Sequence, residues 1–333
     1  MKSHSIIPIF LPELGCPNKC VYCNQKHISG QYVIPDAEEV KNKIEKYLST
    51  IKGKGIYAEL AFFGGSFTSL SLETQIAYVE IAQPYLKDKS INNIRISTRP
   101  DAISEDNIVM LKQYGVSIIE LGVQSLDDDV LMHCGRGYES SVVYEAAEKI
   151  IANNISLGMQ MMIGLPHSTY EKDLFTAKEI IRIGAHGARI YPLLVFANTD
   201  LEHLYNKKEY IPLSVDDAIE RSVDILELFL ESNVKVYKIG LHPSEFIDNG
   251  TLIAGPWIPA FRQHVQAKVW QRKFEKELKN DKLIKGFFIN QSDINSAIGP
   301  NKCNIEIFKQ KGINLSFRID NSLKRGDFYA FYS

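Results

Sequence analysis

Residues 94–121 read IRISTRPDAISEDNIVMLKQYGVSIIEL, and this stretch contains one complete repeat of the pattern that decides the fold. Residues 94–97 and 117–121 are short runs rich in isoleucine, which is typical of buried strands. Between them, residues 105–114 have the apolar spacing of an amphipathic helix. A helix of this length lets the chain cross over and return to a parallel neighbouring strand. The stretch therefore predicts a β-α-β unit.

The same alternation of strand and helix extends over most of the chain. Further strands are predicted at 5–11, 56–63, 157–163 and 188–194, and further helices at 36–50, 72–86, 140–152 and 171–183. Six strands joined by crossover helices predict an α/β fold, a partial (β/α)6 barrel of the TIM type, with its sites at the carboxyl ends of the strands. Residues 234–239 form a seventh predicted strand, which either extends the sheet or flanks the barrel.

The pattern changes after Gly240. A segment rich in proline, glycine and aromatic residues follows, long enough to be a functional loop. Beyond it we predict helices at 262–278 and 304–311 and strands at 314–319 and 327–332. We therefore expect two domains: a barrel over 1–240, and a small α/β extension over 241–333 that completes the substrate side.

Composition is that of a globular protein, with 45% hydrophobic and 23% charged residues. No apolar run reaches the roughly 18 residues of a membrane helix. The N-terminal apolar stretch is too short for a secretory signal, so we expect a cytoplasmic protein. The 38 basic and 40 acidic residues argue against a large nucleic-acid substrate, although a local basic patch fits within a neutral total.

Three thiols occur in the turn after the first predicted strand, in the sequence Cys16-Pro-Asn-Lys-Cys20-Val-Tyr-Cys23. Five cysteines in a chain without an export signal favour reduced metal ligands over disulfides. A four-iron four-sulfur cluster prefers thiolates, and three cysteines leave one iron open. The alternative is a zinc site, which needs a fourth ligand such as His27. The spacing favours the cluster.

This cysteine spacing, with Tyr22 before the last cysteine, resembles the signature of the radical S-adenosylmethionine (SAM) superfamily. Motifs similar to those of the family follow in order at the ends of successive strands: FFGGSFT (62–68), STRPD (97–101), ELGVQS (120–125), RGY (136–138) and MIGLP (162–166). The resemblance implies a [4Fe-4S] cluster on Cys16, Cys20 and Cys23, SAM, and an external electron donor such as flavodoxin or ferredoxin. It also implies cofactor contacts from Tyr22, Gly64, Gly65, Ser66, Thr98, Arg99, Gln124 and Arg136.

Within the superfamily, GGSFT, STRPD, IELGVQSLDDDVL, RGY and RIYPLLV resemble the radical domain of the Elongator catalytic subunit over about residues 5–265. We expect neither the acetyltransferase domain nor the basic N-terminal extension of that subunit. This favours a small nucleobase-type substrate and a lyase, and the similar stand-alone group includes queuine lyase, which forms 7-aminomethyl-7-deazaguanine. Two alternatives stay open: Elongator-like modification of the tRNA wobble uridine, and a zinc-binding regulatory module without enzymatic activity.

Candidate substrate contacts follow the sixth predicted strand. Tyr191 lies at the end of that strand. In the loop after Gly240, Glu245 and Asp248 could accept hydrogen bonds from a guanine-like edge, and Trp257 could stack on the base. The alternative is that Trp257 is a core residue and Glu245 is solvated. His242 is a candidate proton shuttle or, equally in keeping with its position before Pro243, a loop residue.

Overall fold

A half-barrel of parallel strands forms the centre of the molecule. The computed structural model describes residues 4–12, 16, 20–23, 34–241, 250–280 and 284–332. The main sheet has seven strands in the order β1-β2-β3-β4-β5-β6-β8, and every neighbouring pair is parallel. These strands are β1 (His4–Leu11), β2 (Tyr57–Gly64), β3 (Asn93–Thr98), β4 (Val116–Gln124), β5 (Ser156–Ile163), β6 (Gly187–Pro192) and β8 (Lys235–Ile239). The predicted partial barrel is confirmed, and β8 extends the sheet.

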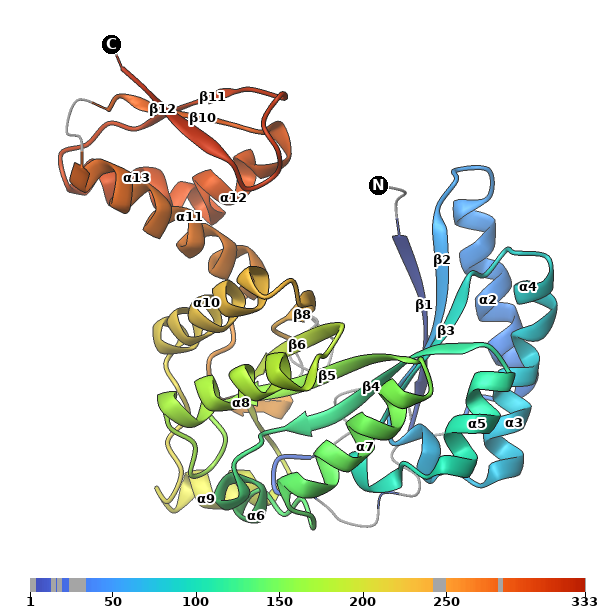
Figure 1. The fold of residues 1–333 in the computed structure, drawn as a ribbon. Coiled ribbons are helices and arrows are strands. Elements are labelled where there is room, and N and C mark those ends of the chain that lie inside the picture. Colours follow the sequence, from blue (N-terminus) through green and yellow to red (C-terminus); the bar gives the residue numbers. More distant parts are fainter. Residues whose placement is uncertain are drawn as a thin grey trace.

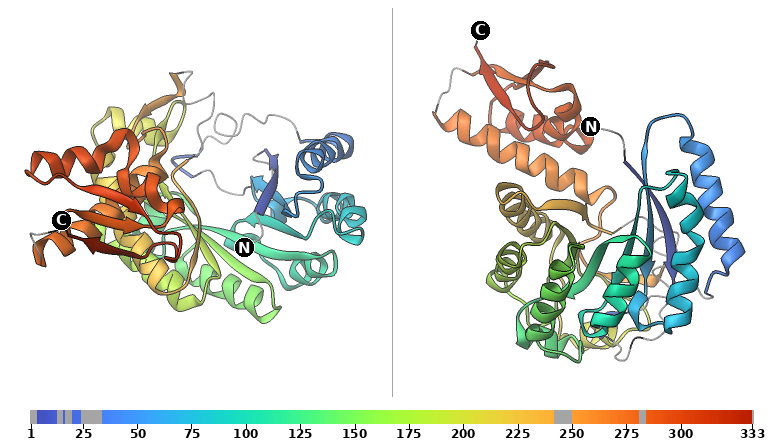
Figure 2. Two further views of the ribbon diagram at one scale, coloured as in Figure 1. Left: turned by 90° about the horizontal axis from the view of Figure 1, so that it is seen from above. Right: turned by 45° about the vertical axis from the view of Figure 1, so that its right-hand side comes forward.

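Helices cover the outer face of the sheet (Figures 1 and 2). They are α2 (Ala37–Ile51), α3 (Leu72–Ile81), α4 (Gln83–Lys87), α5 (Glu105–Gln113), α7 (Ser140–Ala152), α8 (Tyr170–Ile183) and α10 (Val215–Glu231). The short helices α6 (Asp128–His133) and α9 (Asp200–Asn206) lie instead beyond the carboxyl ends of the strands, and 3-10 turns occur at Phe67–Ser69 and Pro100–Ala102. Side-chain caps fix their starts: the Asp36 carboxylate accepts from the Glu39 N–H and the Ser104 hydroxyl from the Asn107 N–H. Strand residues such as Leu60, Ile96 and Ile119 are fully buried in one core with these helices.

The chain after β8 contributes to two further structures. The short strands β7 (Val195–Phe196) and β9 (Leu252–Ala254) pair antiparallel. The long helix α11 (Phe261–Asn280) then leads to a separate three-stranded sheet in the order β11-β10-β12. That sheet comprises β10 (Gly286–Ile289), β11 (Ser316–Ile319) and β12 (Phe328–Phe331), accompanied by α12 (Ile294–Ile298), α13 (Cys303–Gln310) and 3-10 turns at Gln291–Asp293 and Pro300–Lys302. A second, smaller core around Trp270, Phe274 and Phe287 joins it to α11.

The two ends of the half-barrel have different neighbours. The carboxyl ends of the strands point toward α6 and α9, at the bottom of Figure 1, whereas the three-stranded sheet lies beyond the amino ends, at the top. Among the described residues after 240, β9 lies near the carboxyl end, through its pairing with β7. That residues 241–333 complete the substrate side remains a prediction. No helix in the described ranges is long and apolar enough to cross a membrane.

Candidate cofactor site

The cysteine segment is held at the carboxyl end of the half-barrel by backbone hydrogen bonds. The N–H of Cys23 donates to the carbonyl of Cys20 at 2.9 Å, which closes a turn between the two cysteines. The N–H of Val21 donates to the carbonyl of Cys134 after α6 at 3.1 Å, and the carbonyl of Val21 accepts from Leu201 in α9 at 2.8 Å. Cys20 is buried, whereas Cys16 and Cys23 are half-buried. Elements far apart in the sequence therefore position this turn.

Two buried guanidinium groups lie beside the Cys20 sulfur. Arg136 Nη1 is 3.3 Å and Arg99 Nη1 is 3.8 Å from Cys20 Sγ. Arg99 comes from the motif after β3 and Arg136 from the motif after α6, and both were predicted cofactor contacts. Guanidinium groups at these distances can donate hydrogen bonds to the sulfur and stabilise negative charge on it. The site is thus suited to a sulfur that carries negative charge as a metal ligand.

Each guanidinium is fixed by other hydrogen bonds. Arg99 donates to both oxygens of Asp101 at 2.8 Å, and to the carbonyl of Arg136 at 2.6 Å. Arg136 donates from Nε to the hydroxyl of Tyr138 at 3.0 Å and from Nη2 to the carbonyl of Gly122. Burial alone would lower the pKa of Arg136, but Tyr22, Tyr138 and Cys20 raise it overall, so the group stays charged.

The predicted cofactor contacts Ser66 and Thr98 are hydrogen-bonded to each other through their hydroxyl groups. Their hydroxyl oxygens are 2.8 Å apart, and the Ser66 oxygen also accepts from the N–H of Arg99 at 3.1 Å. Thr68 adds a hydroxyl contact of 2.5 Å to Thr98. This network ties the end of β2 to the end of β3 and orients the backbone of Arg99. Its evident role is to position Arg99, and direct cofactor contacts from Ser66 and Thr98 remain a prediction.

Gly64 and Gln124 adopt left-handed backbone conformations at the ends of β2 and β4. Gly64 has a φ of 106°, and a Cβ there would lie 2.2 Å from the carbonyl oxygen of Leu11. That oxygen also accepts from the N–H of Gly65 at 3.0 Å, so the double glycine lets β1 and β2 end together. Gln124 has a φ of 70° at an irregularity in the β4-β5 pairing, and its side-chain oxygen accepts from Gln160 at 3.2 Å. Gly64 and Gln124 therefore each have a structural role in addition to the predicted cofactor contact.

The Tyr22 hydroxyl is a buried polar group without a hydrogen-bond partner among the described residues. Burial raises its pKa well above the usual range, so the phenol is neutral and can donate. A buried donor without a partner is rare in proteins and marks a place where a bound group fits. Together with the thiols and the two guanidinium groups, this donor set fits a sulfur-bound cluster with a polar ligand beside it.

Comparison with known proteins gives the same assignment. A family model described as Radical SAM superfamily matches residues 12–180, and a model described as Radical_SAM C-terminal domain matches residues 185–271. The chain belongs to the radical SAM superfamily. Membership confirms the predicted resemblance and implies a [4Fe-4S] cluster and SAM as cofactors.

This radical SAM protein is also similar to individual proteins of known sequence or structure. An uncharacterized protein of Methanocaldococcus jannaschii is 31% identical over 224 residues, covering 66% of this chain and 65% of that protein. The tRNA uridine(34) acetyltransferase of Dehalococcoides mccartyi is 27% identical over 239 residues, covering 62% of this chain and 52% of that enzyme. The solved structure of the archaeal Methanocaldococcus infernus Elp3 with an N-terminal deletion has a TM-score of 0.65 at 20% identity, covers 83% of this chain and 64% of that chain, and shows the fold alone.

This radical SAM chain spans between about half and two thirds of the length of these relatives. The comparisons do not support the predicted queuine lyase. They favour the alternative, Elongator-like modification of tRNA, over the lyase and over a non-enzymatic zinc module.

A chain of buried charges inside the radical SAM half-barrel was not predicted. Arg95 in β3 donates to Glu59 in β2 at 2.6 Å and also to Glu120 in β4. Glu120 in turn accepts from Arg189 in β6 at 2.5 Å, and the predicted substrate contact Tyr191 lies 3.4 Å from Arg189. The signal was present in the sequence, because each of these charged residues stands within an otherwise apolar strand. Their mutual pairing keeps the interior polar without an uncompensated charge.

Trp257 lines a cavity of about 310 Å³ at the β8 edge of the half-barrel. Its walls include Tyr237, Lys238, Phe261 and Arg262. Burial lowers the pKa of Lys238, with Arg189 and Arg262 adding to the effect. An aromatic wall with two cations suits an anionic or nucleotide-like group. The other predicted contacts, His242, Glu245 and Asp248, and the alternative zinc ligand His27, lie outside the described residues.

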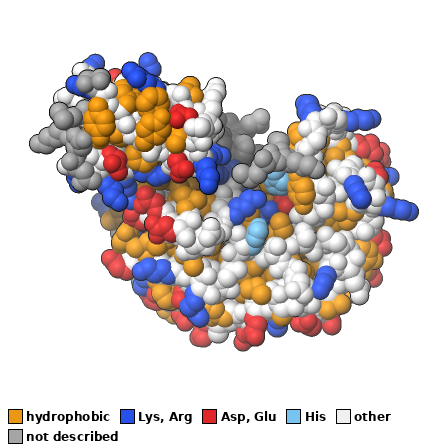
Figure 3. All heavy atoms as spheres, turned by 45° about the horizontal axis from the view of Figure 1, so that its top comes forward, with side chains coloured by type: hydrophobic (Ala, Val, Ile, Leu, Met, Phe, Trp, Pro, Cys, Tyr) orange, Lys and Arg blue, Asp and Glu red, His pale blue; other side chains and the backbone are white. Residues whose placement is uncertain are grey.

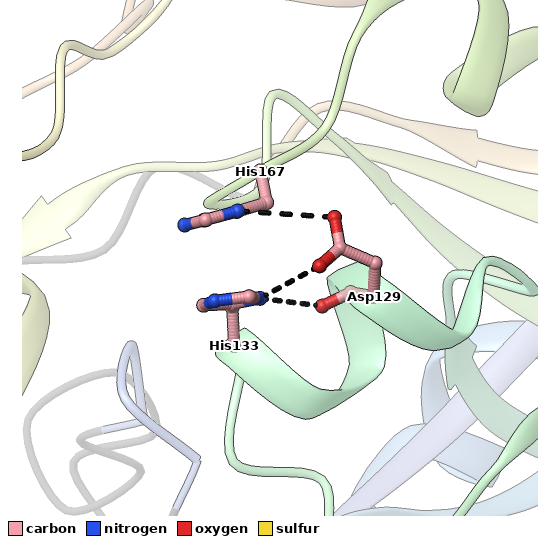
Figure 4. Close-up of side chains that lie close together, drawn as sticks. All are labelled: Asp129, His133 and His167. Atoms are coloured by element: carbon pink, nitrogen blue, oxygen red, sulfur yellow. Dashed lines mark hydrogen bonds and ion pairs between the residues drawn. The ribbon is translucent and has the colours of Figure 1, made fainter.

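A second group of metal-ligand residues lies on the surface next to Cys134. The rings of His133 and His167 stack with their centroids 3.3 Å apart, and Asp129 lies 3.2 Å from His133 Nδ1 (Figure 4). Lys172 already holds the Asp129 carboxylate at 2.7 Å, and His133 Nδ1 is 2.8 Å from the Asp129 carbonyl. The carboxylate and the ring nitrogen therefore have protein partners, and we interpret the group as a surface ion-pair cluster.

Proposed function

We propose that Cys16, Cys20 and Cys23 hold a [4Fe-4S] cluster, that SAM binds beside it, and that the substrate is a tRNA with a wobble uridine as the target. The observation that carries the cofactor part of the proposal is the Cys20 sulfur, which lies 3.8 Å from Arg99 Nη1 and 3.3 Å from Arg136 Nη1. Bound there, a reduced cluster would supply the electron that cleaves SAM to a 5'-deoxyadenosyl radical.

The protein residues have separate tasks in this proposal. Arg136 and Arg99 offset the negative charge of the thiolate ligands, which are otherwise costly to bury. The Tyr22 hydroxyl offers a hydrogen bond to the bound group, and the Ser66–Thr98 network holds the backbone of Arg99 in place. The half-barrel and the helices around it keep water from the reacting atoms.

Two observations support a tRNA substrate over a free base. A relative of this chain is a tRNA uridine(34) acetyltransferase, although the match spans 52% of that enzyme. The charge of the chain is also unevenly distributed: residues 261–333 have 14 Lys and Arg against 7 Asp and Glu, whereas residues 1–260 have 24 against 33. The overall charge of −2 conceals a basic C-terminal region of the kind that binds phosphates.

The cofactor part of the proposal is tested by anaerobic reconstitution with iron and sulfide. We expect about four irons per chain, a reduced-cluster electron paramagnetic resonance signal that changes when SAM is added, and 5'-deoxyadenosine formation. Cys20→Ser should abolish all three. Cys303→Ser is the matched control, because Cys303 is a half-buried thiol in α13 and should behave as wild type. Wild-type iron content in Cys20→Ser would refute the assignment.

The substrate part is tested with the loaded enzyme, reductant and SAM. One reaction contains tRNA and the other contains free queuine, and both are followed by mass spectrometry for 5'-deoxyadenosine and for altered nucleosides or bases. We expect the rate of 5'-deoxyadenosine formation to rise with tRNA and a mass change on the wobble uridine. A shortened deazaguanine base formed from queuine, with tRNA unchanged, would overturn the tRNA proposal.

A further inference from the structure

The outer face of the three-stranded sheet carries a row of aromatic and cationic side chains. The inner face, with Phe287, Phe317 and Phe328, packs on Phe274 of α11. On the opposite face, the register places Arg318 of β11, Phe288 of β10 and Tyr329 of β12 side by side. This face points away from the half-barrel, and Figure 3 shows hydrophobic side chains gathered on the C-terminal lobe.

The rings on this face are held in fixed orientations. Phe288 stacks on Tyr329 with ring centroids 4.8 Å apart and planes 19° apart, and the Tyr329 hydroxyl donates to Asp320 at 2.9 Å. The Phe331 ring packs directly against Gly286, because a Cβ added at Gly286 would lie 2.7 Å from a carbon of that ring. The Arg318 guanidinium lies 4.2 Å from the Phe331 ring centroid. Tyr329 remains 45% exposed, so its ring can contact another planar group.

Among the described residues, Arg318, the cation on this face, lacks the carboxylate partners that Arg272 has. Arg272 on the helix layer pairs with Glu220, Asp224 and Glu227. Within the described ranges, no carboxylate lies at ion-pair distance from the exposed Arg318, nor from Lys285 and Lys324, two exposed lysines elsewhere in the same lobe. These residues belong to the region with a net charge of +7, 14 Lys and Arg against 7 Asp and Glu. A polyanion would complement this surface.

We infer that the Arg318–Phe288–Tyr329 face binds unpaired bases of an RNA. Aromatic rings on an open sheet stack on bases of any sequence, and the unpartnered Arg318 beside them can bind a phosphate. The inference rests on the proposed tRNA substrate and adds a second contact to it. The face lies beyond the amino ends of the strands and the cysteines lie at the carboxyl ends, so only a long molecule could touch both. A free base could not.

The test measures the affinity of the full chain for fluorescently labelled tRNA as a function of salt. In F288L/Y329L, leucine keeps apolar side chains on the sheet but removes the stacking rings, and we expect about tenfold weaker binding. Arg318→Gln should weaken binding several-fold and lower the salt slope by about one. Lys112→Gln, at an exposed lysine on α5 of the half-barrel and outside the basic C-terminal region, is the matched control and should bind as wild type. Thermal melting checks that each variant is folded.

The outcomes separate this inference from the proposed function. If F288L/Y329L and Arg318→Gln bind tRNA as tightly as wild type while wild type modifies tRNA, the proposed function stands and the inference is wrong. If wild type neither binds nor modifies tRNA, the proposed function itself fails. Light scattering gives a further check, because a wild-type dimer that F288L/Y329L converts to a monomer would show that a second copy covers the face, and would also overturn the inference.

Discussion

Among single residues, Arg136 has the most direct link to the proposed cluster. Its Nη1 lies 3.3 Å from the Cys20 sulfur, and its other nitrogens are held by Tyr138 and Gly122. Arg136→Lys keeps the charge but cannot make these contacts together, since lysine lacks the planar fork. We expect 5'-deoxyadenosine formation to fall about 10- to 100-fold. Arg182→Lys, in an exposed pair with Glu179, is the control, and equal rates in the two variants would contradict this role.

Gly64 is the residue on which the junction of β1 and β2 depends. An alanine there would place Cβ 2.2 Å from the Leu11 carbonyl oxygen at a φ of 106°. Gly184→Ala is a matched control, because Gly184 has a φ of 86° but no atom within 4 Å of the added Cβ. Urea unfolding should show Gly64→Ala less stable than Gly184→Ala by about 2 kcal/mol. Equal losses would mean that Leu11 moves aside without cost.

Between elements, Arg272 links α11 to α10 and so joins the lobe to the half-barrel. It lies 2.5 Å from Glu220 and 2.6 Å from Asp224, with Glu227 at 3.2 Å. Arg272→Gln removes the cation shared by these carboxylates and leaves Lys268 beside Glu220. We expect a loss of roughly 1 kcal/mol, limited by the partial exposure of the group. Because salt screens like-charge repulsion, the loss should shrink at 0.5 M salt. A loss in urea unfolding that does not change with salt would point to lost packing.

At the scale of the whole molecule, the two cores should unfold separately. Trp270 belongs to the small core of the C-terminal lobe, and the other tryptophan, Trp257, lies at the half-barrel. In Trp257→Phe, fluorescence therefore reports only on the lobe, while far-UV circular dichroism reports on the whole chain. We expect the fluorescence transition at a lower urea concentration, since the smaller core buries less apolar surface. Coincident transitions would show that α11 couples both cores into one unit.

Much of this molecule follows from local sequence. The strand and helix periods predicted the half-barrel, and VKVYKI at 234–239 predicted β8, because apolar runs and amphipathic spacing are local properties. The three cysteines and the family motifs predicted the superfamily, because ligand type and spacing lie within single loops. The lyase prediction was different, since it depended on expected missing domains and on the total charge, which conceals the basic C-terminal region.

The tertiary structure decided what depends on contacts across the sequence. That Arg99 and Arg136 meet at one sulfur, that Ser66 and Thr98 bond to each other, and that Glu59, Arg95, Glu120 and Arg189 form one buried chain follows from strand order and register. These are distances between side chains far apart along the chain, and no local pattern encodes them. The sequence by itself determined which residues are available at each strand end, and only the packed sheet determined which of them touch.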